Sequence, residues 1–151
     1  MRKRNGFTFI EMLTVLIIMG ILASLAILKY MDLTRAALTS QISGTISIIR
    51  VAAYAYEADH QYQWPAESGP GIIPPELVPY LPTGFEMTKP EYTLDWDNFS
   101  GGGGNYQIGV TVRTQDPVLM AKIVQVLGGT TPYFYAGDTF TYMLIDATGN
   151  W

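Results

Sequence analysis

A single carboxylate interrupts the most apolar segment of this chain. Glu11 is the only ionisable side chain between Phe7 and Leu28, a run of 22 residues. A charge inside a bilayer costs roughly 2.5–3.5 kcal/mol on insertion scales, so a residue kept there ordinarily has a partner and a function. We therefore expect Glu11 to bind a cationic group. The alternative is that its side chain only extends toward the lipid headgroups.

Oxygen-bearing side chains gather at two later places. Asp95 and Asp97 lie close to Asn98 and Ser100, and Asp146 lies near the end of the chain. Calcium binds six to eight oxygens, so a calcium site with ligands from Asp95, Asp97 and Asp146 is one hypothesis. The other is that Asp and Asn form turns here and need no ion.

The remaining candidates for catalysis are weak. The sole histidine, His60, follows Asp59, but adjacent residues on a helix point apart. The chain has no cysteine, which excludes thiol chemistry and a disulfide scaffold. The glycines at 101–104 lack the Gly-Lys-Ser/Thr of a phosphate-binding loop. The sequence predicts no enzymatic activity.

The apolar run is long enough to cross a membrane. Twenty-two helical residues at about 1.5 Å each reach roughly 33 Å. Three cations at positions 2–4 favour a cytoplasmic amino terminus and export of the rest. A cleaved secretory signal is the competing interpretation, but its apolar region is roughly 7–15 residues long and holds no glutamate.

The residues KRNGFTFIE at positions 3–11 resemble the start of type IV prepilins and of type II secretion pseudopilins. The resemblance implies that a prepilin peptidase cleaves between Gly6 and Phe7 and methylates the new Phe7 amine. Glu11 stands where this family keeps its glutamate, which implies a role in filament assembly. Gly20 stands where the helix often loosens in assembled filaments.

Two departures from the family pattern accompany this match. Leu28 replaces a proline that many members carry, so a kink there is weaker or displaced. The absence of cysteine removes the disulfide of many true pilins, which pseudopilins often lack.

Elementary electrostatics favours the same role for Glu11. Cleavage before Phe7 creates an α-amine four residues earlier, and residues at i and i+4 share a helix face. In a low dielectric, pairing the carboxylate with the amine of its own or a neighbouring chain neutralises two costly charges. A subunit docked one turn out of register would leave a buried charge unmatched.

The sequence of the exported part predicts a helix followed by a sheet. Apolar residues recur in steps of three and four from Leu38 to Tyr56, and Trp64-Pro65 ends the helix or lies just past its end. Alternation from Tyr106 to Arg113 predicts a strand, with further strands at 92–96, 133–135 and 139–145.

We therefore predict an α+β fold: a long amino-terminal helix, transmembrane in its first half, packed against a small antiparallel sheet in a pilin-like arrangement. The expected organisation is a leader at 1–6, a transmembrane half-helix at 7–28, an amphipathic half-helix at 29–62, an ordered proline-rich connector at 63–91 and a β-rich part at 92–151 with a short helix at 116–128.

Removing residues 1–6 leaves six basic and thirteen acidic side chains, a net charge of −7, so we expect no nucleic-acid partner. The resemblance implies a structural subunit of a type IV pilus-like filament or a type II secretion pseudopilus. Its partners would be copies of itself, related pilin-like subunits, prepilin peptidase and an inner-membrane assembly platform. The protein would cross the bacterial inner membrane once before joining a periplasmic or cell-surface filament.

Two alternatives stay open. One is a minor or tip subunit whose tyrosine-rich surface primes assembly or binds a ligand, since the chain holds ten tyrosines. The other is a monomeric membrane-anchored domain with an unrelated role.

Overall fold

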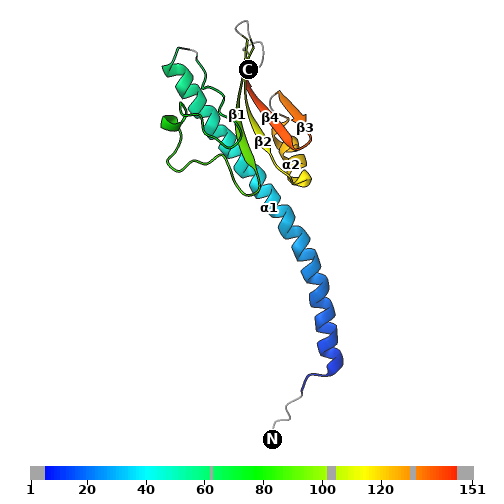
Figure 1. Ribbon diagram of the computed structural model, residues 1–151. Helices are drawn as coiled ribbons and strands as arrows, with labels where there is room; N and C mark the ends of the chain where they lie inside the picture. Colours follow the sequence, from blue (N-terminus) through cyan, green and yellow to red (C-terminus); the bar gives the residue numbers. More distant parts are fainter. Residues whose placement is uncertain (1–5, 62, 102–104, 130–131, 146–151) are drawn as a thin grey trace. The chain divides into compact units, whose positions relative to one another are not determined.

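The computed structural model describes residues 6–61, 63–101, 105–129 and 132–145. The chain divides into two compact units, residues 1–35 and 36–151. Helix α1 (Phe9–Asp59) begins in the first unit and ends in the second (Figure 1). No proline occurs within it, so no backbone donor is lost and the helix runs without interruption.

The first unit is one apolar helical segment without a protein cover. Every residue from Gly6 to Thr34 is exposed, including Phe9 at 85% and Leu28 at 68%. An exposed apolar surface of this extent indicates a surface that lipid or other chains cover. The segment is long and apolar enough to cross a membrane, which is consistent with membrane anchoring.

The second unit is built on a four-stranded antiparallel sheet with strand order β1-β2-β4-β3 (Figure 1). One short helix, α2, follows β2, and a single turn of 3-10 helix, η1, lies in the connector after α1. The bounds are η1 Val78–Tyr80, β1 Thr93–Gly101, β2 Asn105–Arg113, α2 Pro117–Leu127, β3 Tyr133–Ala136 and β4 Thr139–Ile145.

Strand register gives the sheet one apolar face. Trp96 of β1 lies opposite Val110 of β2, which in turn lies opposite Tyr142 of β4. These residues form one buried cluster with the apolar stripe of α1 and the inner face of α2, represented by Ile46 and Ile123. The long helix and small antiparallel sheet confirm the predicted α+β, pilin-like fold class.

Helix α2 begins with a side-chain cap at its amino terminus. The Asp116 carboxylate accepts hydrogen bonds from the backbone N–H groups of Val118 and Leu119, at 2.9 and 3.2 Å. Pro117 occupies the first turn, where its missing N–H costs nothing. The cap begins α2 directly after β2 and thereby places its apolar face in the core.

Strand β1 is longer than the sequence predicts. We expected the strand to end at Trp96 and Asp97 and Asn98 to form a turn, but β1 pairs with β2 as far as Gly101. The expectation of a turn was wrong because tertiary pairing outweighs the low strand propensity of Asp and Asn.

The connector covers the outer edge of β1. The Leu94 carbonyl accepts from Gly71 N–H at 2.8 Å, and Glu67 accepts from Asn98 N–H at 2.7 Å. The Pro65 carbonyl accepts from the Trp96 indole at 3.1 Å. These contacts order the proline-rich segment against the sheet and leave β3 at the opposite edge.

Candidate functional site

The predicted cleavage site lies in accessible, non-helical backbone. Gly6, Phe7 and Thr8 precede the first residue of α1, and Phe7 is 80% exposed. A Cβ atom placed on Gly6 would meet no other atom within 4 Å. The bond between Gly6 and Phe7 is therefore free of the helical hydrogen-bond ladder and open to a peptidase.

Glu11 forms a reciprocal cap with Thr8 at the start of α1. The Glu11 carboxylate oxygen Oε2 accepts hydrogen bonds from the Thr8 N–H and hydroxyl groups, each at 2.8 Å. The Glu11 N–H in turn donates to the Thr8 hydroxyl oxygen at 3.3 Å. This is a capping box, in which a hydroxyl residue and a glutamate three positions later satisfy the backbone donors of the first turn.

This cap was not predicted from the sequence, although the spacing Thr8-x-x-Glu11 is its ordinary signal. In the single chain, the Glu11 carboxylate thus already has a hydrogen-bond partner, Thr8. Because a carboxylate accepts through two oxygens, capping by Thr8 and pairing with an amine are compatible.

Helix α1 continues unbroken through Gly20 and Leu28. Gly20 has open space around it, so no neighbouring group fixes the helix there. Loosening at Gly20 concerns the assembled filament and stays a prediction.

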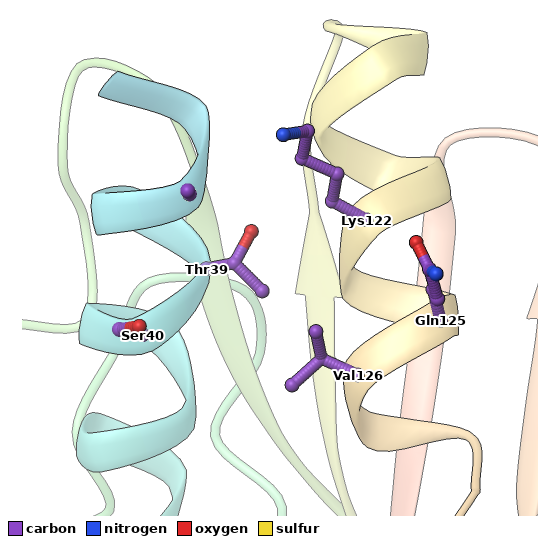
Figure 2. A pocket seen from close by; sticks show the side chains of 6 residues that line it. Thr39, Ser40, Lys122, Gln125 and Val126 are labelled. Carbon is purple, nitrogen blue, oxygen red and sulfur yellow. The ribbon is translucent and has the colours of Figure 1, made fainter. Parts of the chain in front are cut away.

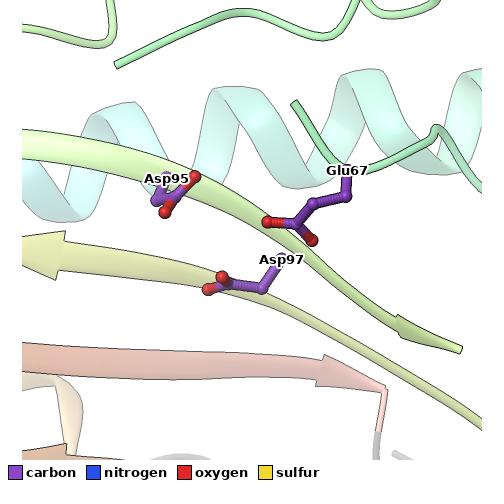
Figure 3. A group of neighbouring side chains, drawn as sticks. All are labelled: Glu67, Asp95 and Asp97. Carbon is purple, nitrogen blue, oxygen red and sulfur yellow. The ribbon is translucent and has the colours of Figure 1, made fainter. Parts of the chain in front are cut away.

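Three carboxylates from two segments lie together beside β1. Asp95 and Asp97 project from β1 and Glu67 from the connector, and one oxygen of each lies within 4.8 Å of the others (Figure 3). Asp97 is only 7% exposed and accepts a hydrogen bond from the Thr111 hydroxyl. Glu67 was not predicted as part of this group, because it is 28 positions before Asp95 and comes close to it only through the fold.

Burial is the main electrostatic influence on this acidic cluster of Glu67, Asp95 and Asp97. It raises the pKa of Asp95 to about 6, and repulsion from Asp97 and Glu67 adds to the rise while Arg113 opposes it. Burial also raises the pKa of Asp97, and the Thr111 hydrogen bond opposes that shift. Close like charges and desolvation both favour a protonated carboxyl here.

The structure describes two of the three carboxylates that the calcium hypothesis names. Asp95 and Asp97 do converge, but Asp146 lies outside the described residues. With one oxygen from each, the three carboxylates supply three of the six to eight oxygens that calcium takes. Exposed acidic groups often gather without an ion, so the hypothesis stays a prediction.

Asp95→Asn should change how stability depends on pH. The folded protein holds the Asp95 proton up to about pH 6, whereas the unfolded chain releases it near 3.8, so ionisation lowers the free energy of unfolding as pH rises between these values. The difference in stability between the variant and the parent should therefore favour the variant more strongly at pH 7 than at pH 4. Thermal melting of purified protein at both pH values measures this, with Glu91→Gln, an exposed carboxylate outside the cluster, as control. An equal change in melting temperature at both pH values would contradict the assignment.

A groove separates α1 from α2 in the second unit, with a volume of about 450 Å³ (Figure 2). Its walls carry the amine of Lys122, the amide of Gln125 and the hydroxyls of Thr39 and Ser40. His60 is exposed at the end of α1, with its ring stacked on Tyr56 at 4.0 Å between centroids.

The long apolar helix and small antiparallel sheet place this molecule among α+β proteins of pilin-like arrangement. Residues 1–27 match the model of the prokaryotic N-terminal methylation motif. The chain therefore carries the prepilin-type signal of type IV pilins and pseudopilins, a structural and not an enzymatic class. Such a signal implies a substrate of prepilin peptidase and assembly into pilus-like filaments. No curated protein and no solved structure matches the chain.

Proposed function

We propose that this chain is a structural subunit of a type IV pilus-like filament or a type II secretion pseudopilus. The observation that carries the proposal is the exposed apolar segment of α1, which follows directly on an accessible Gly6–Phe7 bond within the matched motif. Residues 1–6 are the leader, residues 7–28 cross the inner membrane once with the amino terminus in the cytoplasm, and the remainder is exported.

Glu11 directs assembly in this proposal. Cleavage converts the Phe7 amide into an amine, which is methylated, and this positive group approaches the Glu11 carboxylate of a neighbouring subunit. The pair neutralises two charges that would otherwise be desolvated separately. Thr8 holds the carboxylate at the first turn of α1 and so presents it in a fixed position. The pairing also selects the register of the incoming subunit.

A minor or tip subunit is the second candidate, and the edge strand β3 favours it. Tyr133, Phe134 and Tyr135 are 41%, 60% and 55% exposed in succession. Exposed aromatic side chains are enriched at binding surfaces because they contribute large contact areas at low entropic cost. Such a surface would suit a subunit that primes assembly or binds a ligand.

Filaments sheared from cells that produce the full chain would test both candidates. Mass spectrometry should find a subunit that begins at Phe7 with a methylated amine. A structural subunit should be the most abundant pilin-like protein in the filaments, whereas a tip subunit should be present in trace amounts. Absence of the chain from all filaments, with the protein still in the membrane, would contradict both candidates.

A further inference from the structure

The groove between α1 and α2 takes no part in the proposed function, and both of its walls are faces of helices. Each helix contributes three residues in the spacing i, i+3 and i+4, which places them on one face. The lining residues are Ala36, Thr39 and Ser40 of α1 and Lys122, Gln125 and Val126 of α2 (Figure 2).

Packing in the core holds both walls of the groove in place. Ile42 of α1 and Ile123 of α2 are fully buried in one core cluster, and the lining residue Thr39 is only 3% exposed. The Asp116 cap fixes the start of α2. Side chains on packed helices keep a more precise geometry than side chains on loops, which suits a binding site.

The charge of the groove is opposite to that of the exported part as a whole. From Ala36 to Trp151 the sequence holds eleven acidic and four basic side chains. Lys122 is nevertheless the one charged residue of α2, and none of the described residues that line the groove is acidic. Its side chain extends from α2 toward α1 (Figure 2). An ammonium group in a concave site attracts anions, because the low-dielectric walls focus its field.

The polar groups around Lys122 are suited to a ligand with several acceptor oxygens. An ammonium group can only donate hydrogen bonds, and the Ser40 hydroxyl and the Gln125 amide can also donate. A phosphate group carries negative charge on several oxygens, and lysine is a common phosphate ligand because it acts as a point charge. A carboxylate has only two oxygens and would use fewer of these donors.

We propose that the groove binds the phosphate group of a phosphate ester. This inference goes beyond the proposed function, because it assigns a ligand to a surface outside the proposed membrane segment. Lys122 neutralises the phosphate, while Ser40 and Gln125 donate hydrogen bonds to its oxygens. Ala36 and Val126 contact the carbon atoms of the ester. The volume of about 450 Å³ lies within the range of small-molecule sites and leaves room for these atoms beside the phosphate.

Calorimetric titration of the full chain in a maltoside detergent, which contains no phosphate, tests this site. The probes are glycerol phosphate, a soluble ester, and dioctanoyl phosphatidylglycerol, a lipid ester. We expect saturable binding of at least one of them. Binding of glycerol phosphate would show that a soluble ester is sufficient, whereas binding of the phosphatidylglycerol alone would identify a lipid headgroup as the ligand. Dioctanoylglycerol, a lipid without phosphate, should show no saturable binding.

Three substitutions locate the binding in the groove. Lys122→Gln removes the charge and should weaken binding about tenfold, as expected for the loss of a hydrogen bond to a charged group. Gln125→Glu introduces a carboxylate of nearly equal size and should abolish measurable binding. Arg50→Gln is the control, because it removes the same charge from an exposed position of α1 outside the groove, and it should leave the affinity unchanged.

Two results would overturn the site. One is the absence of saturable binding of either ester to the parent chain. The other is equal affinity of the parent, Lys122→Gln and Gln125→Glu, because the esters would then bind elsewhere on the chain. Neither result would bear on the proposed function, which the composition of sheared filaments tests separately.

Discussion

Glu11→Ala should reduce filament yield by roughly a hundredfold while leaving cleavage, membrane insertion and the exported domain intact. Removing one member of an ion pair that assembly buries is strongly destabilising, because the other charge stays buried without a partner. Alanine enters a bilayer more easily than glutamate, so poor insertion could not explain the loss. Electron microscopy of sheared filaments, with quantification of mature subunit in the membrane, measures the effect.

Two matched variants separate the charge of Glu11 from its role as a cap. Glu11→Gln retains a side chain that can complete the capping box but removes the charge. Thr8→Ala keeps the charge but removes the hydroxyl that donates to the carboxylate, at a cost of about 1 kcal/mol to the helix. If the charge directs assembly, Glu11→Gln should be nearly as damaging as Glu11→Ala, and Thr8→Ala should still form filaments.

The opposite pattern would require a different mechanism. Normal filaments from Glu11→Gln would show that the charge is dispensable, and the pairing with the Phe7 amine would have to be abandoned. A Thr8→Ala variant as defective as Glu11→Ala would show that helix capping is the essential contribution.

Gly6→Val should accumulate as an uncleaved precursor and form no filaments. A branched side chain beside the scissile bond would obstruct the peptidase, yet a Cβ atom on Gly6 meets nothing within 4 Å in the chain itself, so the fold should be unaffected. Intact-mass measurement distinguishes a precursor with Met1 from a mature chain that begins at a methylated Phe7.

The parent chain provides the control for this experiment. Its mature form should begin at Phe7, and Gly6→Ala should be cleaved more slowly than the parent but faster than Gly6→Val. A mature parent that begins near Ile27 would favour a secretory signal, and efficient cleavage of Gly6→Val would contradict the assigned bond.

The features that the sequence predicted well depend on local patterns. The long helix follows from the spacing of apolar residues and the absence of proline, and the alternation from Tyr106 to Arg113 corresponds to β2. Each of these elements is stabilised mainly by contacts that a short window of sequence contains.

The missed features depend on contacts between distant segments, with one exception. The extension of β1 to Gly101 requires β2 beside it, and the position of Glu67 near Asp95 requires the connector to fold along the sheet. Neither contact can be predicted from a short window of sequence. The exception is the cap between Thr8 and Glu11. Its local signal is present in the sequence, but Glu11 was interpreted only as a costly charge in a membrane.

The unequal edges of the sheet limit how the exported domain can associate with other strands. The connector occupies the outer edge of β1, while among the described residues no hydrogen bond joins the outer edge of β3 to another segment. An uncovered edge strand is a template for strand addition, and natural proteins commonly keep such strands short. Strand β3 has only four residues. Within the described residues, growth of the sheet by recruitment of a foreign strand is therefore confined to one side and to a brief stretch of backbone.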